Sequence, residues 1–85
     1  MLFFSFTANA SKNNEPASFL VWVDGGEHGV AEARARQLIE EQGWVVQCLE
    51  GVSETSRDDY FAPCPSLDAF DRAQSEGISF RIISL

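Results

Sequence analysis

Short runs of apolar residues, separated by polar and glycine-rich segments, predict four strands along the chain. Residues 2–7 and 18–24 are apolar and rich in aromatic or β-branched side chains, with a polar, proline-ended loop at 8–17 between them. Residues 44–50 and 78–85 show the same kind of pattern. The clearest strand is the second, because Phe-Leu-Val-Trp-Val is bounded on both sides by polar residues.

Two helices are predicted from apolar spacing and from the residues at their ends. The first spans about residues 28–42 and is stopped by Gly43, which suits a left-handed C-terminal cap. The second starts at Ser66, an N-cap residue, and ends at Gly77. Each helix carries an apolar stripe at helical spacing: Ala31, Ala35, Leu38 and Ile39 in the first, and Leu67, Phe70 and Ala73 in the second.

The resulting order, β-β-α-β-α-β, predicts an α+β fold for a single domain of residues 1–85. We expect a two-layer sandwich with a four-stranded mixed sheet and both helices on one face. The second, third and fourth strands would then be parallel, joined by right-handed crossovers, and the first would pair antiparallel with the second. This fold has ferredoxin-like complexity but not the ferredoxin-like order, which alternates β-α-β-β-α-β.

The face of this sheet away from the helices should carry mainly polar side chains. Alternation along the strands instead places six large apolar residues there: Phe3, Leu20, Trp22, Val45, Leu49 and Ile83. Three interpretations are open: scattered surface residues, a lid formed by residues 51–65 with Val52, Tyr60 and Phe61, or a protein-binding surface, most simply a twofold homodimer. A one-residue slip in the third strand would exchange its two faces.

Charge and composition narrow the classes of partner. The 85 residues include 13 Asp and Glu but only 6 Lys and Arg, a formal charge of −7, which repels phosphate backbones. We therefore expect no nucleic acid and no membrane as partners. No apolar run reaches the roughly 18 residues of a membrane span, and no export signal is recognised. The expected location is cytoplasmic.

A glycine-rich segment, Asp24-Gly25-Gly26-Glu27-His28-Gly29, links the second strand to the first helix. Ligands bind at such places in open α/β sheets, but the segment lacks a dinucleotide or phosphate-loop motif. Asp24, Glu27 and His28 offer the donors of a small-ligand or divalent-metal loop, under the 51–65 segment. The alternative is a plain glycine turn whose carboxylates complement the helix dipole.

No set of residues in the sequence predicts catalysis, a cofactor or structural zinc. A Gly-x-Ser-x-Gly elbow is absent, Cys48 and Cys64 form no C-x-x-C pair, and one histidine cannot complete a Cys/His zinc set. Residues 50–76 hold seven carboxylates against two arginines, which is either a solvated surface or a patch for a basic partner. We expect no enzyme and no cofactor.

The runs Phe19-Leu20-Val21-Trp22-Val23-Asp24, Gly43-Trp44 and Gly77-Ile78-Ser79-Phe80 resemble those of small uncharacterised bacterial α+β proteins of about this length. The resemblance spans nearly the whole chain. It implies a hypothetical-protein family with no established activity and transfers no catalytic or binding residue. The sequence therefore predicts a small acidic, non-enzymatic domain that binds a protein partner or itself through the open sheet face. Ligand or metal binding at residues 24–29 is the alternative.

Overall fold

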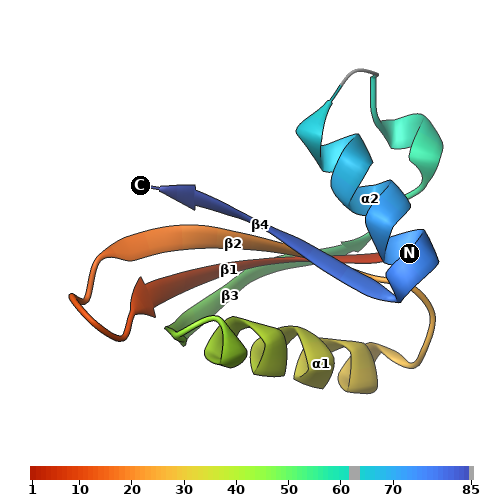
Figure 1. The fold of residues 1–85 in the computed structure, drawn as a ribbon. Helices are drawn as coiled ribbons and strands as arrows, with labels where there is room; N and C mark the ends of the chain where they lie inside the picture. Colours follow the sequence, from red (N-terminus) through yellow and green to blue (C-terminus); the bar gives the residue numbers. More distant parts are fainter. Residues whose placement is uncertain (62–63, 85) are drawn as a thin grey trace.

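The computed structural model describes residues 1–61 and 64–84 and has an α+β fold: a four-stranded antiparallel sheet with two helices (Figure 1). The general class predicted from the sequence is confirmed. Residues 62–63 of the expected lid, and Leu85 of the last predicted strand, lie outside the described residues. The elements in chain order are β1 (Leu2–Ala10), β2 (Pro16–Val23), α1 (His28–Glu41), β3 (Trp44–Glu54), the 3-10 helix η1 (Arg57–Asp59), α2 (Pro65–Glu76) and β4 (Ile78–Ser84).

The sheet has the order β3-β1-β2-β4, and each neighbouring pair is antiparallel. The predicted mixed sheet, with three adjacent parallel strands, is therefore wrong. β2 and β3 do run in the same direction, but β1 lies between them, so the connection through α1 passes over one strand. β4 then returns beside β2 at the opposite edge. The alternation of side chains along a strand indicates its two faces but not its neighbours, so this order could not be read from the pattern.

The larger core lies between α1 and one face of the sheet. The buried stripe of α1, Ala31, Ala35 and Ile39, packs on alternate residues of β1 and β2. These strand residues are fully buried: Phe4, Phe6, Ala8, Phe19, Val21 and Val23. Phe19 also contacts the rings of Trp44 and Phe80, with centroid separations of 5.3 and 5.8 Å. The hydrophobic effect on this face therefore holds all four strands together.

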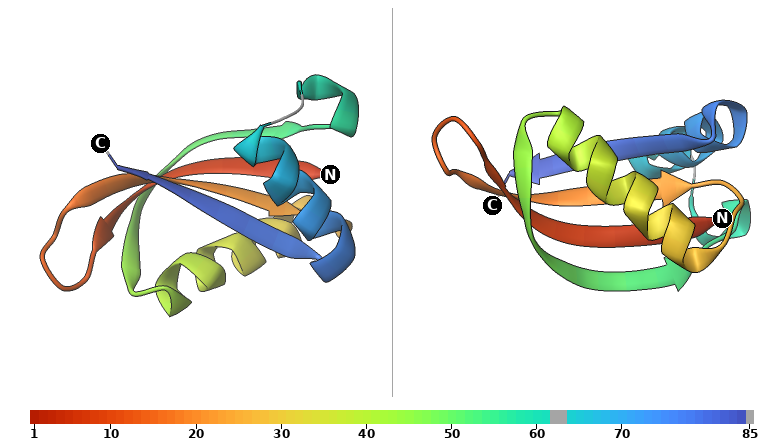
Figure 2. Two further views of the ribbon diagram at one scale, coloured as in Figure 1. Left: turned by 45° about the horizontal axis from the view of Figure 1, so that its top comes forward. Right: turned by 90° about the horizontal axis from the view of Figure 1, so that it is seen from below.

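The second helix packs on the opposite face, so the predicted placement of both helices on one face is also wrong. Ala69, Phe70 and Ala73 of α2 form a smaller core with Trp22, which is 1% exposed. Figure 2 shows α1 and α2 on opposite sides of the sheet. β3 and β4 are the two edges of the sheet, so the chain between them must cross it. Since α1 occupies one face of the sheet, α2 crosses on the opposite face.

β3 contains two irregularities that reverse part of its predicted pattern. Ser5 pairs with Gly51 but Phe6 pairs with Leu49, so Glu50 is an extra residue. A second shift leaves Gln47 without a partner on β1. Leu49 consequently packs into the α1 core, whereas the pleat of a regular strand would place it on the other face.

Candidate interaction edge and ligand pocket

The sheet face proposed from the sequence as a binding surface is partly covered by α2. Phe3 and Leu20 pack partly buried against the core around Trp22, and the Phe3 and Trp22 rings are 5.0 Å apart. Tyr60 closes the same cluster: its hydroxyl accepts a hydrogen bond of 2.8 Å from Trp22 Nε1. Of the residues expected in a lid, Tyr60 thus covers the sheet, while Val52 is 41% and Phe61 is 91% exposed.

The other predicted interaction residues do not form a common patch. Leu49 is on the α1 side, Val45 is 50% exposed on the β3 edge, and Ile83 is 40% exposed on the β4 edge. Between these edges the uncovered part of the face is polar, and its Thr7 hydroxyl donates a hydrogen bond of 2.9 Å to Glu50. An open apolar face, as the sequence predicted it, is therefore absent from the described residues.

The two edges of the sheet differ in how they are protected against pairing with another strand. Edge strands present unpaired backbone N–H and C=O groups, and proteins guard them with bulges, charges or short length. β3 has two irregularities and carries Glu50 and Glu54. Both features disfavour a further strand on this side.

Among the residues that the structure describes, the second half of β4 has no bulge and no charged side chain of this kind. Its seven residues pair with β2 in continuous register, from Ile78 with Val23 to Ser84 with Ala17. The strand contains no proline, and Arg81 is its one charged residue. Exposure increases along the strand, and Ile82 and Ile83 are 42% and 40% exposed on opposite faces.

Neither helix covers this second half of β4. α2 lies over its first half, where the Ser79 hydroxyl donates to the Ala69 carbonyl and Arg81 donates to Ser66 Oγ at 2.9 Å. α1 packs mainly on β1, β2 and β3. Figure 1 shows the C-terminal half of β4 extending away from both helices. Alternation along this strand places Ile82 on the helix side of the sheet and so predicts its burial, which is why its exposure is missed from the sequence.

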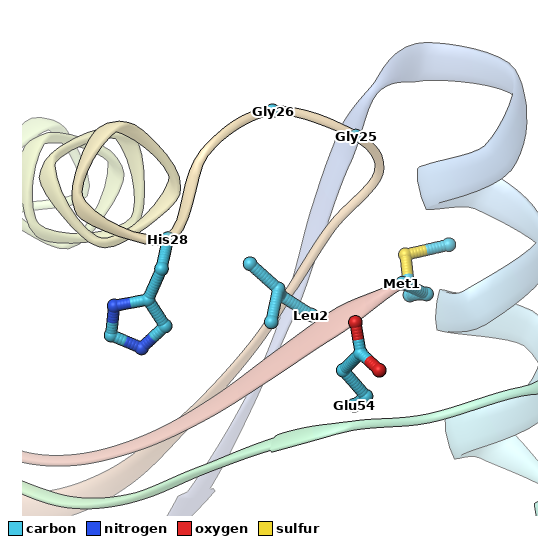
Figure 3. A pocket seen from close by; sticks show the side chains of 6 residues that line it. All are labelled: Met1, Leu2, Gly25, Gly26, His28 and Glu54. Atoms are coloured by element: carbon cyan, nitrogen blue, oxygen red, sulfur yellow. The ribbon is translucent and has the colours of Figure 1, made fainter.

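The glycine-rich segment forms one wall of a cavity of about 400 Å³ (Figure 3). Gly25 and Gly26 have φ of 78° and 90°, a left-handed backbone that favours glycine and lets the chain turn from β2 into α1. His28 from this segment reaches the cavity; the other lining residues are Met1, Leu2 and Glu54. Asp24 and Glu27, proposed from the sequence, are exposed and do not line it.

The predicted metal set is not assembled in the structure. Across residues 1–61 and 64–84, no group of three or more His, Cys, Asp or Glu side chains is arranged to hold a metal ion. His28 and Glu54 lie on opposite sides of Leu2 in the cavity (Figure 3). The His28 ring instead contacts Phe4, with a centroid separation of 5.8 Å. The cavity therefore offers separate polar groups around an apolar floor.

The surroundings of Cys48 disfavour a reactive thiol. Cys48 is exposed on β3 opposite Thr7, and a hydrogen bond and charge repulsion from Glu50 raise its pKa. A raised pKa lowers the fraction of thiolate, which is the nucleophilic form. Cys64 is half-buried immediately before α2.

Comparison with known proteins adds no relative: no family model, curated protein or solved structure matches the chain. In the described part of the chain, neither helix is long and apolar enough to cross a membrane. The function must therefore be inferred from the edge strand and the cavity.

Proposed function

We propose that this chain is a non-enzymatic interaction domain of the cytoplasm that binds another protein chain along the free edge of β4. The observation that carries the proposal is the contrast between the two edges: β3 is irregular and acidic, whereas β4 is regular and carries two exposed isoleucines in its second half. A partner strand would continue the sheet and satisfy the outward backbone groups of β4, a recognised mode of protein recognition.

The two isoleucines supply the apolar part of the proposed contact. Full burial of an isoleucine is worth about 1.5–3 kcal/mol, so covering the exposed two-fifths of each contributes roughly 0.6–1.2 kcal/mol. Main-chain hydrogen bonds along Arg81–Ser84 would add to this. The formal charge of −7 supports a protein as the partner rather than nucleic acid or an anionic membrane.

The proposal is tested by sedimentation velocity over a wide concentration range, comparing the wild-type chain with Ile82→Lys. A lysine on an edge strand disfavours strand addition. With a second copy as the simplest source of a partner strand, we expect the wild type to associate and Ile82→Lys to sediment as a monomer. Val45→Lys is the matched control, because Val45 is similarly exposed on the opposite edge. Identical behaviour of wild type and Ile82→Lys at every concentration would count against the proposal.

A second candidate function is small-ligand binding in the cavity beside residues 24–28. Its volume of about 400 Å³ lies in the range of ligand pockets. The Glu54 carboxylate favours a small amine, with the apolar part of the ligand over Leu2. Titration with a panel of primary amines should shift the amide resonances of Gly25 and Gly26, and Glu54→Gln should abolish the shifts. Absence of any shift at millimolar amine would remove this candidate.

A further inference from the structure

The edge of β4 has a pattern that a second copy of the same strand can match. In antiparallel pairing, residues directly opposite each other point to the same face of the sheet. A twofold axis that passes between two copies of β4 therefore places one residue, the central residue, opposite the same residue of the other copy. The choice of central residue on β4 then fixes the whole register. Four residues in and near the uncovered half can be compared: Phe80, Arg81, Ile82 and Ile83.

Charge and shape exclude two of these centres. A centre at Arg81 would place two guanidinium groups directly opposite each other, which is destabilising. A centre at Phe80 would also pair Ile78 and Ser79, and Ser79 lies under α2, where its hydroxyl donates a hydrogen bond to the Ala69 carbonyl.

Between the remaining centres, Ile82 gives the longer pairing among the residues that the structure describes. A centre at Ile83 pairs only Ile82–Ser84 within the described strand, whereas a centre at Ile82 pairs Phe80–Ser84. In that register Ile82 packs on the partner's Ile82, and Arg81 lies opposite the partner's Ile83. No charged residue then faces another charged residue across the pair.

Resting on the proposed function, we infer that the occupant of β4 is a second copy of this chain, paired antiparallel about a twofold axis at Ile82. The product is a continuous sheet of the order β3-β1-β2-β4-β4-β2-β1-β3. Both α1 helices lie on one of its faces and both α2 helices on the other. The pairing is isologous and closes at two copies.

Closure of this kind accounts for the unequal protection of the two edges. The dimer hides both regular β4 edges and leaves only the two irregular, acidic β3 edges in solvent. Pairing of β4 with β3 of another copy would instead leave a free β4 at the end of every assembly and so permit open growth. It would also require a regular ladder on the strand whose bulges disfavour one.

Disulfide trapping tests the register. In a Cys48→Ser, Cys64→Ser background, Ile82→Cys places two thiols directly opposite each other, with Cβ atoms about 4.5–5.5 Å apart before adjustment. Since Ile82 is 42% exposed, the change leaves the monomer fold intact. We expect mild oxidation to give a covalent dimer at least tenfold faster than for Ile83→Cys, offset by two residues, or Val45→Cys on the other edge.

The outcomes separate this inference from the proposed function. A rapid dimer for Ile82→Cys alone supports the twofold register. If Ile82→Lys abolishes association but Ile82→Cys crosslinks no faster than Val45→Cys, the twofold register is overturned and the edge function stands. Non-covalent species that grow beyond two copies overturn the closed dimer. If Ile82→Lys changes nothing, both proposals fail.

Discussion

The contact between Tyr60 and Trp22 gives the sharpest test of how α2 is held on the sheet. Trp22 is 1% exposed, and its indole Nε1–H donates a hydrogen bond to the Tyr60 hydroxyl at 2.8 Å. The same hydroxyl also forms a hydrogen bond of 2.9 Å with Thr55 Oγ1. Tyr60→Phe keeps the ring that packs on Phe70 and removes only the acceptor, which leaves the indole N–H buried without a partner.

An unsatisfied buried donor costs about 1–3 kcal/mol. Native domains have roughly 0.05–0.15 kcal/mol of stability per residue, so the whole chain has about 4–13 kcal/mol to lose. We therefore expect Tyr60→Phe to remove a substantial share of the stability. In a domain of this size, each kcal/mol corresponds to a decrease of about 4–8 °C in Tm.

Urea unfolding followed by far-ultraviolet circular dichroism measures this loss without depending on the fluorescence that the mutation itself perturbs. The control is a double-mutant cycle with Trp22→Phe, which removes the indole N–H. In that background Tyr60→Phe should cost about 1–2 kcal/mol less, because no buried donor is left unpaired. Equal costs in both backgrounds, or a loss under about 0.5 kcal/mol in the wild type, would refute the reasoning.

Three further predictions concern single side chains elsewhere. Glu50→Gln should lower the pKa of Cys48 and speed its alkylation by iodoacetamide at pH 8 in a Cys64→Ser chain; an unchanged rate would contradict the assigned cause. The pKa of Asp59 is lowered below its usual value of 3.8, mainly by a hydrogen bond from the Ser56 backbone N–H and to a lesser degree by one from the Thr55 hydroxyl. The contribution of Asp59 to stability is therefore present above pH 3.8 and is lost as the pH falls below it. Asp59→Asn should therefore flatten the dependence of the urea midpoint on pH between 6 and 2, and an unaltered slope would be the negative result. Gly77→Ala should destabilise the fold by about 1 kcal/mol, because the φ of Gly77 is 92°. Gly29→Ala in α1 should instead stabilise the fold by about 0.5–1 kcal/mol. Thermal midpoints equal to that of the wild type would contradict both expectations.

Local features of the fold could be predicted from the sequence because short-range physics decides them. The apolar spacing of α1 predicted residues 28–42, and the helix spans His28–Glu41. Gly77 ends α2 in the left-handed conformation expected of a C-terminal glycine. Ser56 is the N-cap of the single short turn η1, and its backbone N–H donates a hydrogen bond to the Asp59 carboxylate.

The arrangement of the sheet could not be predicted in the same way. Placing β1 between β2 and β3 depends on contacts between residues more than forty positions apart, such as Phe6 with Leu49. The two irregularities of β3 lie in the pairing with β1, and no local sequence pattern indicates them. Trp22 and Phe3 did indicate that this face is covered, since large apolar side chains on a face predicted to be solvent-exposed need other residues packed on them. The pattern leaves open the 51–65 segment or a partner as that cover, whereas the second helix is predicted on the other face.

The candidate sites were predicted unevenly for the same reason. His28 reaches a cavity because the glycine turn that positions it is local. Glu54 joins that cavity from the end of β3, a strand predicted to stop at residue 50. The exposure of Ile82 follows from its position on an edge strand beyond both helices, which depends on the sheet order.

The division of the core into two clusters has a consequence for partial unfolding. The cluster under α1 involves all four strands, while the smaller one under α2 is centred on Trp22, with Phe3 and Leu20 partly buried beside it. We expect α2 to detach in a sub-global opening that costs less than complete unfolding, and its amides to exchange with solvent before those of β1 and β2. Each 1.4 kcal/mol removed from this small cluster raises the open population about tenfold. The stability of a single helix therefore sets how often the chain displays the aromatic surface that it otherwise conceals.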